Sequence, residues 1–172
     1  MEPREVMREL ERNREVFSSL LAGLDSALVH WKPAADKWCL LEILCHLLDE
    51  EREDFRARAR LLLEKPGEPF PPIDPQGWVL ARDYMGQDFG QTLQQFLEER
   101  EQSLQWLRSL DHPDWKQPSR HPRLGTISAG MFLYSWLAHD YLHIRQITRT
   151  KYQYLCTHAP EPVDYAGDWI PV

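Results

Sequence analysis

The sequence lacks any long apolar run, which excludes proteins that cross a membrane on a hydrophobic helix. No stretch approaches the ~18 consecutive apolar residues that such a helix needs. The first five residues are mostly charged, and no apolar core of a secretory signal follows them. We therefore expect a cytoplasmic protein that has no membrane partner.

Cysteine and basic charge are also in short supply. The three cysteines are an odd number and form no C-x-x-C pair, which argues against a disulfide framework. Lysine and arginine number 20 against 27 acidic residues, so the formal net charge is −7, and no basic stripe stands out. This charge disfavours nucleic acid as a partner. The partner that we expect is a small-molecule substrate.

Common signatures of catalytic nucleophiles and phosphate sites are missing too. The chain contains no G-x-S-x-G, no glycine-rich phosphate loop and no H-E-x-x-H. Any candidate site must therefore be built from another pattern of residues.

What the sequence does contain is four long amphipathic segments. In each of them apolar residues recur at three- and four-residue steps, which is typical of a helix with one buried face. The predicted helices span residues 4–26, 40–64, 88–110 and, from Thr126 or Ser128, to about Lys151. No segment shows convincing strand alternation. With 172 residues, 42% of them hydrophobic, the chain is predicted to form one all-α domain, residues 1–172, with the architecture of a four-helix bundle.

Two irregular segments complete the predicted architecture. Residues 65–87 contain five prolines and form a long connection between the second and third helices. We expect Trp78 and Tyr84 to pin this connection to the bundle, where it can wall a site. From about Tyr152 the chain continues as a C-terminal extension, which we expect to pack through Trp169 and Ile170.

The fourth predicted helix carries His139 and His143, which are one helical turn apart and therefore share a face. They continue an apolar stripe through Phe132, Trp136 and Ile147, so both imidazoles should face the interior of the bundle. A buried imidazole needs partners for two ring nitrogens. The spacing alone is consistent with two satisfied core histidines or with one shared metal ion.

A third histidine, His46, lies on the second predicted helix at the seam between its apolar and acidic sides. Taken alone, it indicates a boundary or surface position. Three neutral imidazoles and a water are typical of a catalytic metal site, so the question is whether His46 meets the other two. The acidic residues near it, which we expect to form a solvated face, are Glu42, Asp49, Glu50 and Glu53.

Glu50 is the best placed of these acids, because it follows His46 by one helical turn. It is the candidate catalytic residue, able to orient His46, to serve as a fourth ligand or to act as a general base. Asp140 follows His139 directly but lies about 100° away around a helix. We expect Asp140 to contact another group or solvent rather than a metal.

Two segments resemble the signatures of the DinB-like superfamily, which includes metal-dependent hydrolases of the YfiT type. Residues 38–51 are similar to its pattern of a tryptophan, a serine and then a histidine followed by acids, and residues 125–147 are similar to its second signature. The resemblance runs from the first helix through Ile147. It implies a four-helix bundle in which His46, His139 and His143 bind one divalent metal. Cys39 departs from the pattern, because the family usually has a serine or threonine at this helix cap.

The resemblance also implies a function. Some members use low-molecular-weight thiols as cosubstrates, so our leading interpretation is a metal-dependent thiol S-transferase or hydrolase. Three imidazoles suit several divalent transition metals; we favour zinc or nickel, with iron or manganese as alternatives. The rival interpretation is a non-catalytic, stress-associated bundle that binds a metal or another small ligand. The resemblance is also compatible with a homodimer.

Overall fold

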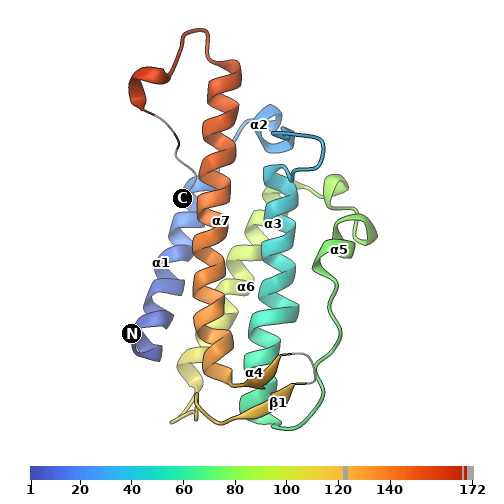
Figure 1. The fold of residues 1–172 in the computed structure, drawn as a ribbon, viewed down its shortest axis with the longest axis vertical. Coiled ribbons are helices and arrows are strands. Elements are labelled where there is room, and N and C mark those ends of the chain that lie inside the picture. Colours follow the sequence, from blue (N-terminus) through green and yellow to red (C-terminus); the bar gives the residue numbers. More distant parts are fainter. Residues whose placement is uncertain (122–123, 168, 170–172) are drawn as a thin grey trace.

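The structure is a computed structural model that describes residues 1–121, 124–167 and 169. Four long helices lie side by side and form the predicted all-α bundle (Figure 1). The long helical elements are α1 (Pro3–Leu21), the consecutive α3 (Leu40–Asp49), η1 (Glu50–Phe55) and α4 (Arg56–Glu64), α6 (Phe89–Ser109) and α7 (Ala129–His158). The short elements are α2 (Ser26–His30), α5 (Pro75–Ala81), the 3₁₀ turns η2 (Tyr84–Gly86) and η3 (Asp164–Ala166), and the strands β1 (Ser119–His121) and β2 (Gly125–Ile127).

The last helix is longer than the sequence pattern predicts. Its N-cap is Ser128, whose hydroxyl accepts a hydrogen bond from the Met131 N–H at 3.2 Å, whereas Thr126 lies in β2. The helix continues to His158 instead of ending near Lys151. Its final turns therefore project beyond the other helices (Figure 1).

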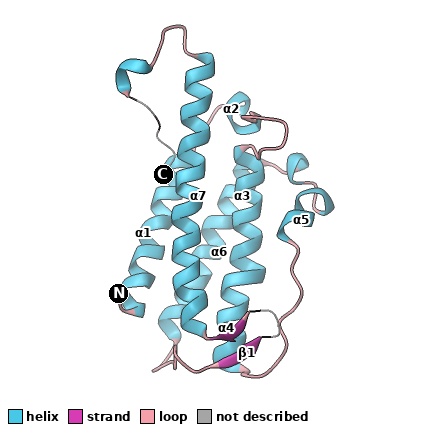
Figure 2. Cartoon of the chain, in the orientation of Figure 1, coloured by secondary structure: helices cyan, strands magenta, loops and turns pink. Residues whose placement is uncertain are grey.

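A small antiparallel hairpin contradicts the expectation that the chain has no strands. β1 and β2 pair Ser119 with Ile127 and His121 with Gly125 at one end of the bundle (Figure 2). Each strand has only three residues, which is too short to produce a recognisable alternation. The buried Ile127 packs with Ala59 and Phe132, so the hairpin is part of the bundle's packing.

The connection between α4 and α6 is held, as expected, against the long helix formed by α3, η1 and α4. This helix is the second of the four predicted helices and is called the second helix below. Trp78 and Tyr84 are buried in a cluster with Cys39, Leu41 and Cys45. The connection is nevertheless partly helical, because it contains α5 and η2.

The C-terminal extension is described only in part. The Trp169 ring lies 5.4 Å from the Tyr152 ring, and Ile170 lies outside the described residues.

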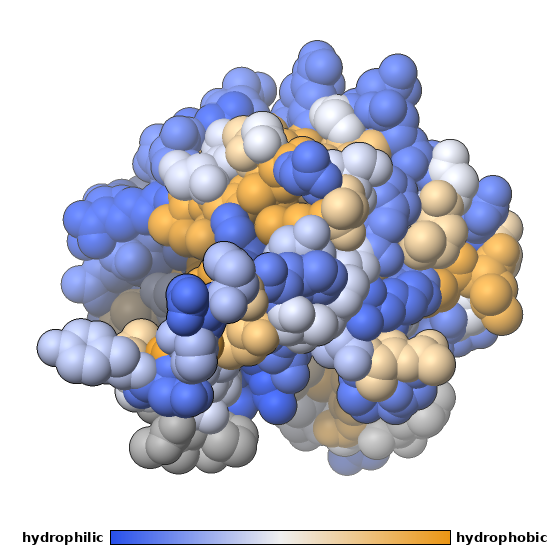
Figure 3. Space-filling view, turned by 90° about the horizontal axis from the view of Figure 1, so that it is seen from above, coloured by the Kyte–Doolittle hydropathy of each residue, from blue (hydrophilic) through white to orange (hydrophobic). Residues whose placement is uncertain are grey.

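The face of the molecule that is seen from above is mostly hydrophilic and carries an apolar patch near its middle (Figure 3). Among the described residues, no helix combines the length and the apolar content that are needed to cross a bilayer. The apolar faces of the helices are instead turned inward. On α1, the side chains of Val6, Leu10, Phe17 and Leu21 are fully buried, and Asn13 shares their stripe.

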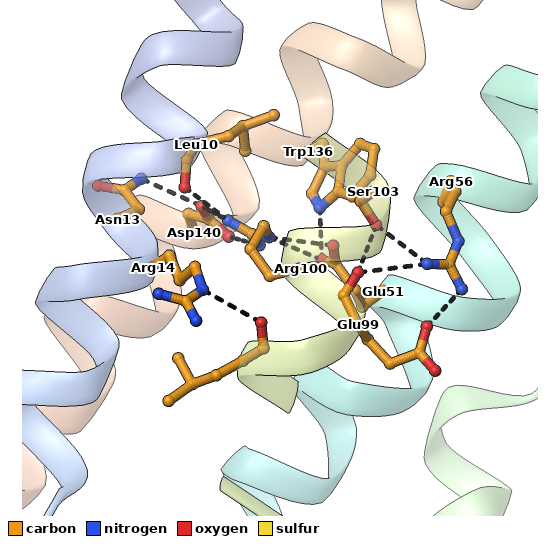
Figure 4. A network of polar contacts seen from close by, with 11 residues as sticks. Leu10, Asn13, Arg14, Glu51, Arg56, Glu99, Arg100, Ser103, Trp136 and Asp140 are labelled. Atoms are coloured by element: carbon orange, nitrogen blue, oxygen red, sulfur yellow. Dashed lines mark hydrogen bonds and ion pairs between the residues drawn. The ribbon is translucent and has the colours of Figure 1, made fainter. Parts of the chain in front are cut away.

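Asn13 is buried because it belongs to a polar network at the centre of the bundle (Figure 4). The enclosed Arg100 guanidinium donates to both oxygens of Asp140 at 2.7 and 2.8 Å and to both oxygens of Glu51 at 3.0 and 3.1 Å. Asn13 donates to Asp140 at 3.1 Å, and the Trp136 indole donates to Glu51 at 2.9 Å. Asp140 thus contacts another group, which is one of the two outcomes expected for it.

The electrostatics of this network hold the arginine in its charged form. Burial by itself lowers the pKa of Arg100, but the ion pairs with Asp140 and Glu51 outweigh burial and leave its pKa above the usual value. The network contains one guanidinium and two carboxylates, contributed by α6, η1 and α7. Removing the cation would leave two buried carboxylates without a counter-charge.

The second helix contains a π-helical turn, η1, that the sequence pattern does not reveal. In such a turn the backbone bonds run from residue i to i+5, which adds a residue to the turn and changes the direction of the side chains beyond it. Glu51 reaches Arg100 from η1, while the Phe55 ring lies 4.9 Å from the His139 ring. The turn therefore contributes both to the central network and to the surroundings of His139.

Replacing Arg100 with methionine should destabilise the protein by about 3–5 kcal/mol, because Glu51 and Asp140 lose the buried cation that neutralises them. Urea unfolding followed by circular dichroism measures this loss. The matched control is Arg108→Met, which removes a half-exposed arginine paired with Glu11 and should change stability by no more than about 0.5 kcal/mol. Equal stabilities for the two variants would show that the network does not hold the bundle together.

Gly130→Ala should destabilise the start of α7 by about 1–3 kcal/mol through overpacking. The Gly130 N–H donates to the Trp115 carbonyl at 2.9 Å, and a Cβ at Gly130 would lie 2.8 Å from that oxygen. Gly90→Ala is the control, since its Cβ would approach nothing closer than 3.4 Å and alanine favours a helix. Thermal melts of both variants check this, and a Gly130→Ala protein as stable as Gly90→Ala would refute the tight contact.

Candidate metal centre

Three histidine side chains from two helices meet inside the bundle. His46 comes from the last turn of α3, whereas His139 and His143 occupy successive turns of α7. The Nε2 atom of His139 lies 3.3 Å from Nε2 of His46 and 3.0 Å from Nε2 of His143. One nitrogen of each ring lies within 4.8 Å of the other two. The fold thus brings together the three residues that the sequence singles out.

These separations suit ligands of a single metal ion. Zinc–nitrogen bonds of about 2.0–2.1 Å at tetrahedral angles place two ligand nitrogens about 3.3 Å apart. When Nε2 binds a metal, Nδ1 carries the proton and donates to a group in the surroundings. In this structure Nδ1 of His46 and Nδ1 of His143 are buried and have no hydrogen-bond partner among the described residues. The donor set therefore consists of three imidazoles that face one another through Nε2.

Burial keeps the three imidazoles neutral. Burial, with a further contribution from His143, lowers the pKa of His46 to about 3. Burial and the charges of the neighbouring groups lower the pKa of His139 to about 2. Burial also lowers the pKa of His143. Neutral imidazole is the form that binds metals, so protons do not compete for these nitrogens at neutral pH.

Aromatic rings flank the cluster on two sides. The Trp38 ring centroid lies 5.0 Å from that of His46, and the Phe55 centroid lies 4.9 Å from that of His139. His46 and His143 are only 7% and 8% exposed, whereas His139 is half-buried. The cluster is therefore least covered at His139. A catalytic metal site requires such an opening, because one coordination position must remain free for water or substrate.

Glu50 places a carboxyl group beside the cluster. Its Oε1 lies 3.9 Å from Nδ1 of His46, which is beyond hydrogen-bond distance, and the side chain is almost fully buried. Burial, followed by the effect of neighbouring Asp54, raises the pKa of Glu50 to about 8. The carboxyl group is therefore mainly protonated at neutral pH.

The expectation of a solvated acidic face is wrong for three of its four residues. Glu42, Asp49 and Glu50 are buried, and only Glu53 is exposed. The reason is that neighbouring segments supply partners. Glu42 accepts from the Lys32 ammonium at 2.7 Å and from the Cys39 N–H at 2.9 Å, which completes a capping box despite the unusual cap residue.

Asp49 is buried by the long connection. It accepts from the Tyr84 hydroxyl at 2.5 Å and pairs with Arg82 at 2.8 Å. Both partners follow α5, so the segment predicted to wall a site also neutralises an acid one residue before Glu50.

The sequence analysis does not identify two polar residues beyond Glu50. Asp54 follows Glu50 by one helical turn and helps to raise its pKa, and Arg58 forms an ion pair with Asp54. A signal for them exists in the sequence, because His46, Glu50, Asp54 and Arg58 recur every four residues. These residues form a polar row along one side of the second helix.

Comparisons with known proteins give the family. The DinB superfamily model matches residues 9–147, a range that includes all three histidines. Among solved structures, this chain is similar to YfiT from Bacillus subtilis, described as a probable metal-dependent hydrolase with an unusual four-helix bundle topology. The similarity has a TM-score of 0.78 at 19% sequence identity and covers 88% of this chain and 87% of YfiT. No curated protein matches the chain. Because the family match spans most of its length, the chain belongs to the DinB superfamily.

Proposed function

We propose that this protein is a metal-dependent enzyme in which His46, His139 and His143 hold one divalent transition metal. The observation that carries the proposal is the approach of their three Nε2 atoms, at 3.0 and 3.3 Å from the central one. Membership of the DinB superfamily supports it, as does the description of YfiT as a probable metal-dependent hydrolase. The nucleophile that we propose is water or a low-molecular-weight thiol, so the reaction is hydrolysis or thiol S-transfer.

In the proposed reaction the metal and the protein side chains have different roles. A bound divalent metal would lower the pKa of a coordinated water or thiol and so supply a nucleophile near neutral pH. The buried His46 and His143 fix the depth of the site, and the half-buried His139 marks its opening. Trp38 and Phe55 keep water away from the flanks of the imidazoles.

Glu50 is the residue that we propose to hold and move a proton. Its Oε1 atom faces Nδ1 of His46, so the ionised carboxylate can orient that ring, and the same group can exchange a proton with the nucleophile. A carboxyl group whose pKa is about 8 is well matched to proton transfer near neutral pH.

The all-nitrogen donor set also bears on the identity of the metal. Imidazoles suit zinc, nickel, copper and iron, whereas manganese prefers carboxylate and water oxygens. We therefore propose zinc or nickel as the physiological metal, with iron as the next choice.

Elemental analysis of untagged protein should find about one transition metal per chain in the wild type, as expected for a single shared site. His46→Ala and His143→Ala should each lose it, although the two residues lie on different helices. His30→Ala is the matched control, because the hydrogen bonds that this exposed histidine forms with described residues stay within α2, so its loss should leave the metal content unchanged.

Two measured metal contents would contradict the proposal. A wild type that takes up no zinc, nickel, iron or manganese would reduce the histidines to packing residues. Metal that remains in the His46→Ala variant would place it somewhere other than the shared site. Metal-loaded protein that neither hydrolyses esters and amides nor transfers thiols to electrophiles would favour the non-catalytic alternative.

Glu50→Gln should weaken metal binding by about 10–100-fold, because the group facing His46 no longer becomes an anion. The pKa of Glu50 is about 8 without metal, and a nearby cation favours its ionised form. Metal binding at pH 7 should therefore release close to one proton more from the wild type than from Glu50→Gln, and this difference should disappear well above pH 8. Calorimetry in buffers of different ionisation enthalpy measures it.

The matched control for this experiment is the exposed acid Glu53, whose replacement by glutamine removes a carboxylate from the same helix. Glu53→Gln should release as many protons as the wild type. If Glu50→Gln also behaves like the wild type, the carboxyl group of Glu50 does not respond to the metal.

A further inference from the structure

A pocket of about 530 Å³ lies at the end of the polar row that starts at the metal centre. The connection between α4 and α5 forms one wall through Phe70, Pro71 and Ile73, and α7 contributes Phe132. Pockets of this volume with mainly apolar walls typically hold small organic molecules. Its polar lining includes Asp54 and Arg58, which are the last two members of the row.

Arg58 is the chemically distinctive group in this pocket. It is only 9% exposed, and its guanidinium carbon lies 4.7 Å from the centre of the Phe70 ring and 5.9 Å from that of Phe132. Its Nε faces Asp54, with which it forms an ion pair. A guanidinium fixed between two aromatic rings can receive a carboxylate through two parallel hydrogen bonds.

The pocket and the metal centre are joined on both helices. On the second helix, Asp54 lines the pocket and lies one helical turn after Glu50, whose Oε1 is 3.9 Å from Nδ1 of His46. On α7, Phe132 precedes His139 by seven residues (139 − 132), or about 10 Å along a helix axis. A molecule of roughly that length would match the separation between the pocket and the histidines.

We infer that this pocket binds the non-reacting end of the substrate, and that the substrate is an elongated molecule with an alkyl or aryl body and a terminal carboxylate that pairs with Arg58. The apolar walls receive the body, and the stacked guanidinium receives the acid. The assignment of the other end to the metal centre rests on the proposed function. The carboxylate subsite itself rests only on Arg58 and its surroundings.

Substitutions of Asp54 and Arg58 should change the affinity for an acid in opposite directions, and this tests the inference. Asp54 competes with an incoming carboxylate for the same guanidinium, because it is the existing partner of Arg58. Neutralising Asp54 should strengthen the binding of an acid, whereas neutralising Arg58 should weaken it. A residue that merely supports the fold would not produce this opposition.

The experiment is calorimetric titration of the full chain with 4-phenylbutyrate and, separately, with its neutral amide. The acid should bind about 10–100-fold more tightly than the amide, as expected for hydrogen bonds to a charged group. Arg58→Gln should abolish this preference, and Asp54→Asn should increase it. Arg60→Gln, an arginine on the exposed side of the same helix that pairs with Glu64, should leave it unchanged.

Repeating the titration on metal-loaded and chelator-treated protein separates this inference from the proposed function. Preference for the acid that persists without metal and disappears in Arg58→Gln supports the subsite, even if the protein proves to bind no metal. Preference that requires metal and survives in Arg58→Gln places the acid on the metal and overturns the subsite. Equal binding of acid and amide overturns it as well. Should Arg58→Gln fail to fold, the sign of the change in Asp54→Asn decides.

Discussion

The buried guanidinium of Arg100 sets the constraint on which the rest of the structure depends. A planar guanidinium offers its donors in a rigid fork, so all of its partners must arrive in fixed directions. These partners are Glu51 from η1, Asp140 from α7 and the Leu10 carbonyl from α1. Satisfying them together fixes how each of the three partner helices is turned about its own axis relative to α6, which carries the arginine.

This rotation also orients the metal centre. Each carboxylate that binds Arg100 directly follows a residue of the site, since His139 precedes Asp140 and Glu50 precedes Glu51. Consecutive residues of a helix point about 100° apart. When Asp140 is held on Arg100, His139 is therefore turned toward α3, and when Glu51 is held there, Glu50 is turned toward His46. The central network and the site are two consequences of one arrangement of helices.

The sequence predicts the helices and the histidines better than it predicts their surroundings. Apolar spacing is a local property, and it correctly locates four helices and the inward face that carries His139 and His143. The partners of buried polar groups are not local. Asn13 and Asp140 are 127 positions apart, and Trp136 and Glu51 are 85 positions apart, so no periodicity relates them. For the same reason Asp49 is wrongly predicted to lie on a solvated face, because its partner Tyr84 is 35 positions away.

The π turn is the feature that the sequence predicts least well. Residues 40–64 read as one regular helix, yet six of them form η1. The turn permits two adjacent glutamates to serve different groups, with Glu50 near His46 and Glu51 on Arg100. A π turn satisfies its backbone less well than an α-helix does, so it persists where tertiary contacts favour it. Here both glutamates provide such contacts.

The two buried polar clusters treat charge in opposite ways, and this difference favours the metal-binding interpretation. The Arg100 network is ionised, and its charges are matched by hydrogen bonds in nearly every direction. The histidine cluster is neutral, because burial depresses the pKa values of its imidazoles and raises that of Glu50. Two of its buried nitrogens, Nδ1 of His46 and Nδ1 of His143, lack a partner among the described residues.

A cluster evolved only for packing gains nothing from such unpartnered nitrogens, since a buried polar group without a hydrogen bond costs about 1–3 kcal/mol. A dication at the Nε2 atoms would fix the tautomer of all three rings and turn the Nδ1 proton of His46 toward an ionised Glu50. The same polar row continues through Asp54 to Arg58, which places Glu50, the residue proposed to transfer a proton, between the candidate metal centre and the pocket. If a metal binds there, the charge of the site would come from its ligand, because the buried histidines and Glu50 are neutral without it.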